Sequence, residues 1–137
     1  MITQQDTRRS QPPRPRPLVL LADGDDDTRE LYGVALPAYG FQTIVDDGAQ
    51  VVARSLDASP DVIVTDIWLP RYDGWGLVEQ LKRDARTRDI PIVVLTGYAA
   101  PSVRERASRE GCAALLMKPY LPEELARALR ELLGTAV

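Results

Sequence analysis

Five short apolar runs, separated by longer segments, constrain this chain more than any other feature of its sequence. The runs lack regular polar alternation, so they fit strands that are buried on both faces, as in parallel sheets covered by helices. One run is weaker because it contains the polar residues Gln42 and Thr43, and we expect it to be an edge strand. The expected strands cover residues 18–22, 41–45, 62–64, 92–95 and 113–117.

The segments around these runs place apolar residues on one helical face. Pro37 should break or kink the last turn of the first segment, whereas Pro101 is acceptable at the first position of another. Strand and helix alternate five times, which predicts an α/β fold with a doubly wound parallel sheet and right-handed crossovers. Periodicity alone leaves the order of the strands open. The expected helices cover residues 26–39, 49–56, 74–84, 101–110 and 122–133.

The composition is typical of one globular domain. The chain has 137 residues, of which 45% are hydrophobic and 27% are charged. No apolar run reaches the roughly 18–20 residues that span a membrane, so we expect no membrane partner. The single cysteine, Cys112, excludes an internal disulfide, and the absence of histidine excludes an imidazole base or metal ligand. We therefore expect a cytoplasmic protein.

Residues 1–17 differ in composition from the rest of the chain. They contain four arginines, one acidic residue and four prolines, a mixture that buries too little apolar surface to order itself. We interpret them as a flexible arm that precedes a domain over residues 18–137. This domain has 13 basic and 19 acidic residues, a net charge of −6, so we expect no nucleic-acid partner.

Four polar residues follow the expected strands at the points where the strands end: Asp23, Asp66, Thr96 and Lys118. The carboxyl ends of parallel strands lie along one edge of a sheet, where ligands usually bind, so we expect these side chains to converge there. Strands also end in polar residues simply because loops begin there. For any one of these positions taken alone, this explanation competes with a functional role. Four chemically complementary groups in one layer favour a site.

The chemistry of this set favours phosphoryl transfer. Two carboxylates 4 Å apart repel by roughly 4 kcal/mol at an effective dielectric constant of 20, which implies a cation between them. Oxygen ligands without histidine or paired cysteine suit Mg²⁺ better than zinc. An ammonium and a hydroxyl can bind phosphoryl oxygens, and a carboxylate nucleophile among such groups forms an aspartyl phosphate. No glycine-rich nucleotide-binding loop is present.

Residues 18–134 resemble the receiver domain of two-component response regulators, as in stand-alone, chemotaxis-regulator-like members. The resemblance implies the flavodoxin-like strand order 2-1-3-4-5 with five helices. It also implies a cis peptide bond between Lys118 and Pro119. The motifs that carry the resemblance identify the family only in combination, because each one alone is common. They cover residues 19–23, 25–31, 62–70, 73–74, 91–97 and 111–120.

The resemblance also implies a role for each site residue. Asp66 would be the phosphoacceptor, Thr96 the switch hydroxyl, and Lys118 the contact to the phosphoryl group. Asp23, Asp66 and the backbone carbonyl of Trp68 would hold Mg²⁺. The phosphoryl group would come from a phosphohistidine on a histidine kinase or a phosphotransfer protein, and an unknown downstream protein would receive the signal.

This chain departs from the family pattern at two positions of the site. Family members carry a second acid after the first strand, which contacts Mg²⁺, but here that residue is Gly24. Asp25 could reach the metal instead, or it could cap the following helix. The fifth strand has Leu115 where a rotating aromatic residue is common, so aromatic switching there is not expected.

The expected function is phosphorylation-dependent signalling, in which the chain is not an enzyme beyond its own phosphoryl transfer and dephosphorylation. The alternative is a pseudo-receiver that binds proteins without being phosphorylated, and Gly24 favours it. A related phosphohydrolase would need an acid where this chain has Trp68. The resemblance also implies that Trp68 and Tyr98 occupy positions from which family side chains influence access of hydrolytic water, which predicts a long-lived phosphoryl state.

Overall fold

The computed structural model describes residues 14–69 and 72–134. Within these ranges, five parallel strands form one sheet in the order β2-β1-β3-β6-β7. A short antiparallel pair, β4 (Trp68–Leu69) and β5 (Tyr72–Asp73), follows the central strand. The sheet consists of β1 (Leu18–Ala22), β2 (Gln42–Asp46), β3 (Val62–Thr65), β6 (Ile92–Thr96) and β7 (Ala114–Met117). The expected flavodoxin-like order 2-1-3-4-5 is confirmed.

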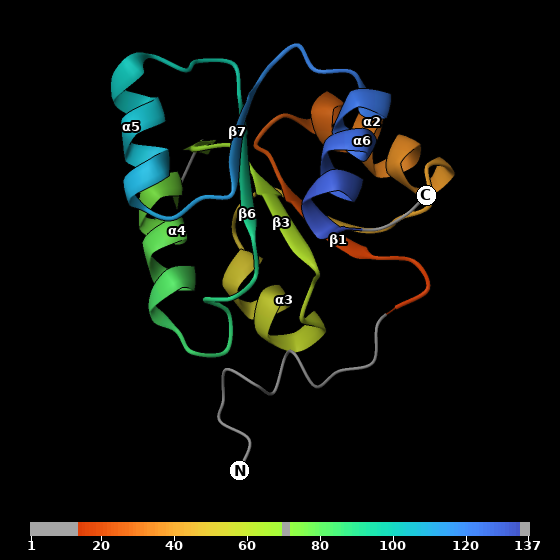
Figure 1. Ribbon diagram of the computed structural model, residues 1–137, viewed down its shortest axis with the longest axis horizontal. Helices are drawn as coiled ribbons and strands as arrows, with labels where there is room; N and C mark the ends of the chain where they lie inside the picture. The colour runs from red at the N-terminus through yellow and green to blue at the C-terminus, as the bar shows by residue number, and fades with distance from the viewer. Residues whose placement is uncertain (1–13, 70–71, 135–137) are drawn as a thin grey trace.

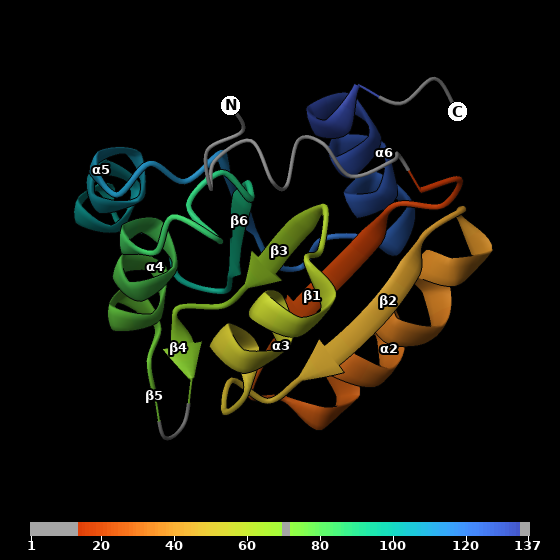
Figure 2. The same cartoon turned by 90° about the horizontal axis from the view of Figure 1, so that it is seen from below.

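Helices cover both faces of the sheet, as the doubly wound fold requires. Figure 1 shows α4 and α5 on one side of the sheet and α2 and α6 on the other, and Figure 2 shows the same arrangement from below. All five expected helices are present, with ends within two residues of the prediction. They are α2 (Asp26–Ala38), α3 (Val51–Ala58), α4 (Gly74–Arg83), α5 (Pro101–Arg109) and α6 (Pro122–Leu133).

The core consists of apolar layers on the two faces of the sheet. Because successive side chains of a strand point to opposite faces, Val19 and Leu21 pack with α2 and α6, whereas Leu20 packs with α3 and α4. A smaller cluster under α5 joins Val94 of β6 with Val103. The central strands β1, β3 and β6 are buried along their whole length, as predicted from their continuous apolar runs.

The fifth strand differs from its prediction. Its apolar run was expected to be buried on both faces, but Ala114, Leu115 and Leu116 are only half-buried and Met117 is 45% exposed. The reason is that β7 lies at the edge of the sheet, next to β6 alone. β2 forms the opposite edge, as its polar residues predicted.

Pro37 ends α2 close to the expected place. The helix stops one residue later, at Ala38. Proline has no N–H, so it leaves the carbonyl of Gly33, four residues earlier, without its helical donor. The hydroxyl of Thr43 in β2 donates to this carbonyl at 3.3 Å, which ties the interrupted turn to the edge strand.

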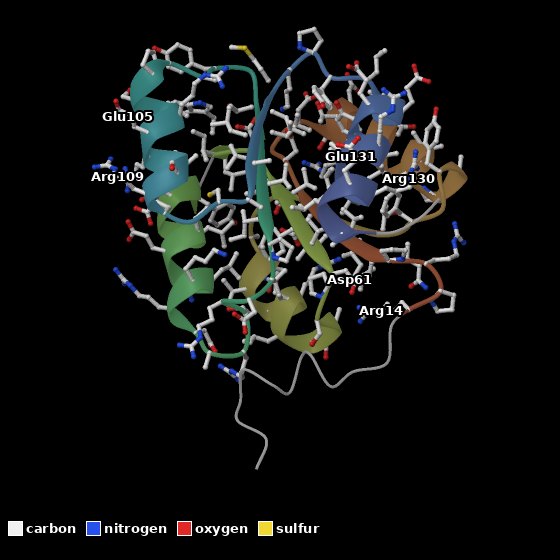
Figure 3. All side chains as sticks on the ribbon, viewed as in Figure 1. Arg14, Asp61, Glu105, Arg109, Arg130 and Glu131 are labelled. Atoms are coloured by element: carbon white, nitrogen blue, oxygen red, sulfur yellow. The ribbon has the colours of Figure 1, made fainter. Side chains whose placement is uncertain are left out.

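The last residues before β1 are attached to the domain, which differs from the expectation of a flexible arm up to Pro17. Arg14 donates to the carbonyl oxygens of Ala58 and Ser59 at the end of α3 and pairs with Asp61 (Figure 3). Arg16 donates to the carbonyl of Pro37 at 2.7 Å. The remainder of the predicted arm, residues 1–13, lies outside the described residues. Within the described ranges, no helix has the length and apolar character needed to cross a membrane.

Candidate functional site

Asp23 and Asp66 lie at the carboxyl ends of two neighbouring strands. The backbone N–H of Asp66 donates to Ala22 and that of Asp23 donates to Asp46, both at 3.0 Å, so the hydrogen-bond ladders of the sheet hold both residues in place. Their side chains are almost fully buried, at 6% exposure for Asp23 and 9% for Asp66. Two carboxylates in such a place require nearby positive charge.

Lys118 supplies that charge from the end of β7. Its ammonium group lies 2.6 Å from Oδ2 of Asp23 and 3.0 Å from Oδ2 of Asp66. The backbone N–H of Lys118 donates to the carbonyl of Thr96 at 2.8 Å, which extends the pairing of β6 with β7. Burial alone would lower the pKa of Lys118, but the hydrogen bonds and charges of the two carboxylates outweigh it and raise this pKa.

Backbone N–H groups orient the other oxygen of each carboxylate. Oδ1 of Asp23 accepts from the N–H of Asp25 at 2.9 Å, and Oδ1 of Asp66 accepts from the N–H of Trp68 at 3.0 Å. Each oxygen retains further acceptor capacity. The two carboxylates and one ammonium together carry one negative charge, so the cluster can accept an additional cation.

Thr96 lies at the same edge of the sheet, at the end of β6, and is fully buried. Its hydroxyl accepts from the backbone N–H of Tyr98 at 3.4 Å. A methyl group added at the neighbouring Gly97 would meet no other atom within 4 Å. The Thr96 hydroxyl uses its oxygen in this hydrogen bond and keeps its proton for donation to an anion that binds at this end of the strand.

Trp68 and Tyr98 form an aromatic pair next to these groups. Both side chains are mostly exposed, at 59% and 58%. Their rings meet edge to face, with centroids 6.1 Å apart and an interplanar angle of 62°. The pair joins the loop after Asp66 to the loop after Thr96.

The family model for the response regulator receiver domain matches residues 19–130. The chain belongs to this family. The receiver domain is 33% identical over 119 residues to the DNA-binding dual master transcriptional regulator RpaA of Synechocystis. This match covers 85% of this chain and 49% of RpaA. It is 28% identical over 119 residues to the polar-differentiation response regulator DivK of Brucella ovis, covering 86% of this chain and 97% of DivK.

Among solved structures, the receiver domain is similar to that of the sensor histidine kinase PA1611 from Pseudomonas aeruginosa. The TM-score is 0.79 at 26% identity, and the match covers 88% of this chain and 99% of the other. That structure has a magnesium ion coordinated in its active-site cleft. The first curated relatives are longer proteins, of which this chain spans between 7% and 51%.

Receiver domains bind Mg²⁺ in their active site, and the donor set of this chain fits a weakly held ion. Mg²⁺ is commonly held by one or two carboxylates together with phosphate oxygens and water. Asp23 and Asp66 supply two carboxylates, and the carbonyl of Trp68 is a further oxygen nearby in sequence. Within residues 14–69 and 72–134, however, no three acidic, histidine or cysteine side chains gather closely enough to form a complete metal site.

Asp25 has a different role in this structure from a metal ligand. Its Oδ2 accepts from the backbone N–H of Thr28 at 2.9 Å and from the Thr28 hydroxyl at 2.7 Å, so it caps α2. These hydrogen bonds lower the pKa of Asp25. The side chain is exposed, and of the two alternatives open at this position the structure favours the helix cap.

Two residues of α2 contact the site region but were not predicted from the sequence. Arg29 donates to the carbonyl of Asp23 at 2.5 Å and pairs with Asp26. Tyr32 is buried, and its hydroxyl donates to the carbonyl of Tyr120, two residues after Lys118. The available signal was a tyrosine on the apolar face of a helix, because a buried phenol requires a partner for its hydroxyl.

Proposed function

We propose that this receiver domain accepts a phosphoryl group on Asp66 from a phosphohistidine on a histidine kinase or a phosphotransfer protein. The main support is the ammonium of Lys118, which lies 3.0 Å from Asp66 and 2.6 Å from Asp23. This ammonium is a cation that contacts both the acceptor carboxylate and its acidic partner at one buried point. Such partners imply a cytoplasmic location.

The step is a direct transfer between two nucleophiles. An oxygen of Asp66 forms a bond to phosphorus, while the bond from phosphorus to the donor nitrogen breaks and leaves its electron pair on the imidazole. Lys118 can move with the new phosphoryl oxygens, since a lysine ammonium is a mobile point charge. When bound, Mg²⁺ would supply positive charge to the same oxygens, held by Asp23, Asp66 and the carbonyl of Trp68.

Thr96 would then report the modification. Its hydroxyl now accepts from the N–H of Tyr98 at 3.4 Å, a long and weak hydrogen bond. A phosphoryl oxygen is a strong, charged acceptor, and the Thr96 hydroxyl, which acts only as acceptor towards Tyr98, can donate its proton to it. The change would reach the loop after β6 and alter binding to a downstream protein. Catalysis would be limited to this transfer and the later hydrolysis of the phosphoryl group.

A second candidate is a pseudo-receiver that binds its partners without being phosphorylated. Gly24 supports this alternative because it has no carboxylate to hold a metal, and the Asp25 carboxylate caps α2. The first candidate is stronger because the trio of Asp66, Thr96 and Lys118 has no use in a domain that serves only as a docking surface.

Intact-mass measurement after incubation with acetyl phosphate and Mg²⁺ separates the two candidates. The parent protein should gain one phosphoryl group, and Asp66→Asn should gain none. Asp57→Asn is the matched control, because it makes the same change at an exposed carboxylate of α3 and should behave like the parent. A parent that stays unmodified, also with a phosphohistidine-bearing phosphotransfer protein as donor, would favour the pseudo-receiver.

A further inference from the structure

Tyr32 connects α2 to the segment that carries Lys118. It is 3% exposed and packs in the core between α2 and α6, together with Leu36 and Leu125. Its hydroxyl donates to the backbone carbonyl of Tyr120. A buried hydroxyl and a carbonyl that satisfy each other would both lose a partner if either moved.

The segment from Lys118 to Leu121 is held at three points. At its start, the N–H of Lys118 donates to Thr96 in β6 at 2.8 Å. At its end, the N–H of Leu121 donates to the carboxylate of Glu124 in α6 at 3.3 Å. The hydrogen bond from Tyr32 to Tyr120 lies between these two along the chain and comes from α2.

The same helix also holds Asp23. α2 begins three residues after Asp23, and Arg29 in its first turns donates to the carbonyl of Asp23 at 2.5 Å. One helix therefore contacts the backbone of the acidic residue through Arg29 and the backbone beyond the lysine through Tyr32. The 2.6 Å contact between Lys118 and Asp23 joins the two attached segments.

The segment has room to move if this attachment is lost. An open pocket of about 580 Å³ lies between part of the segment and α2, and its lining includes Thr28, Leu31, Tyr32, Lys118 and Leu121. Leu31 and Leu121 are more than half exposed, so apolar packing does not close this side. Tyr120 packs against the core cluster that contains Tyr32 and Leu36, and the Tyr32 hydroxyl adds the hydrogen bond that ties the backbone of the segment to α2.

We propose that Tyr32 is a positioning residue for Lys118: its hydroxyl sets the place of the ammonium against Asp23 and Asp66. This inference rests on the proposed role of Asp66 for its functional consequence, but the placement of Lys118 can be measured without phosphorylation. Loss of the hydroxyl removes one of the three hydrogen bonds that hold the 118–121 segment, and small misplacements of a catalytic group are costly to rate.

The chain is well suited to a direct test because it contains only two lysines, Lys82 and Lys118. In full-length protein labelled with ¹³C at lysine Cε, Lys82→Arg identifies the Lys118 signal. Tyr32→Phe removes only the hydroxyl and should shift or broaden the Lys118 signal while leaving that of Lys82 in place. Tyr39→Phe, the same change at an exposed tyrosine after α2, should leave both signals unchanged.

Leu36→Val separates positioning from general loosening of α2. Leu36 is fully buried in the same helix, and the substitution should lower the unfolding temperature without moving the Lys118 signal. The inference is wrong if Tyr32→Phe lowers the unfolding temperature but leaves the Lys118 signal as in the parent. It is also wrong if Leu36→Val moves that signal as much as Tyr32→Phe does.

The rate of phosphorylation gives the functional readout. With acetyl phosphate and Mg²⁺, Tyr32→Phe should react about tenfold more slowly than the parent, and the two controls should react at the parental rate. A parent that reacts no faster than Tyr32→Phe would overturn the inference while leaving the proposed function intact. A parent that is not phosphorylated at all would refute the proposed function, and the lysine signals alone would then decide the placement of Lys118.

Discussion

The ring of Trp68 meets the ring of Tyr98 edge to face, with the centroids 6.1 Å apart. Each residue lies two positions after a site residue, Asp66 in one case and Thr96 in the other. The pair therefore links the two loops that flank the site. Both rings are large and lie at the surface, where they can restrict the approach of water to a phosphoryl group on Asp66.

We expect replacement of both rings to shorten the life of the phosphoryl state. Trp68→Ala with Tyr98→Ala removes both rings from the approach to Asp66 and should lose the phosphoryl group several-fold faster than the parent, measured as decay of the phosphorylated mass after removal of the donor. Tyr72→Ala, an exposed tyrosine on β5, is the control. Equal decay in all three proteins would contradict the prediction.

Gly74→Ala should destabilise the domain. A methyl group at this position would lie 2.4 Å from both Cα and the carbonyl oxygen of Ile67, and backbone atoms cannot move aside as a side chain can. Overpacking of this kind costs about 1–3 kcal/mol, measured by urea unfolding. Because Ile67 follows Asp66, phosphorylation should also slow.

Gly97→Ala provides the contrast to that substitution. The added methyl group meets no atom within 4 Å, so the free energy of unfolding should stay close to that of the parent. The same open space is where we expect the phosphoryl group beside Thr96, so phosphorylation should fall. A Gly97→Ala protein that is phosphorylated at the parental rate would show that this space is not used.

Arg14→Ala should lower the free energy of unfolding although Arg14 precedes the first strand. The guanidinium donates to Ala58 at 2.7 Å and to Ser59 at 2.9 Å, where α3 ends and its dipole is negative. A cation at a helix C-terminus with such contacts contributes about 1–2 kcal/mol. Arg104→Ala, at an exposed arginine of α5, is the control for the loss of one charge. A loss as small as that of the control would contradict the prediction.

Magnesium affinity should respond to Gly24 and not to Asp25. Gly24→Asp adds a carboxylate beside Asp23 and should tighten Mg²⁺ binding roughly tenfold. Asp25→Ala should bind like the parent, because the Asp25 side chain caps α2. Trp68 fluorescence is the readout, with Trp75→Phe removing the other tryptophan. Weaker binding by Asp25→Ala would restore Asp25 as a ligand, and a flat titration of the parent in millimolar Mg²⁺ would favour the pseudo-receiver.

Stability should fall at alkaline pH in part through Cys112. Burial raises the pKa of its thiol from 9.0 to about 11, so the folded protein holds this proton more tightly than the unfolded chain. The stabilising contribution is therefore complete below pH 9 and is lost as the pH rises towards 11. Cys112→Ala should remove on the order of 1 kcal/mol of this decline, given solvent screening of a partly exposed group. Identical pH profiles of unfolding for both proteins would contradict the assignment.

The secondary structure and its alternation were predictable from local pattern. Strands β1, β3 and β6 are fully buried, so their sequences are continuous apolar runs, a pattern that is typical of strands in the middle of a parallel sheet. The prediction was wrong about the burial of β7, because an edge strand next to a half-exposed surface can also be apolar. Residues 14–17 also differed from prediction, because composition does not reveal the carbonyl groups of distant helix ends.

The polar residues at the strand ends are the part of the site that the sequence predicted best. Parallel strands place their carboxyl ends on one edge, so the positions of Asp23, Asp66, Thr96 and Lys118 in the chain were enough to predict a common edge for all four. The pattern of apolar runs could not predict the contact between the side chains. Only the structure shows that the Lys118 ammonium is shared by Asp23 at 2.6 Å and Asp66 at 3.0 Å.

By itself, the sequence determined the α/β alternation, the residues that end each strand and the absence of imidazole chemistry. The tertiary structure alone decided that Tyr32 contacts the segment after Lys118 and that Trp68 meets Tyr98. The physical reason is that periodicity and propensity act between near neighbours in the chain. These contacts depend on how separate elements pack, and packing is settled by the whole core at once.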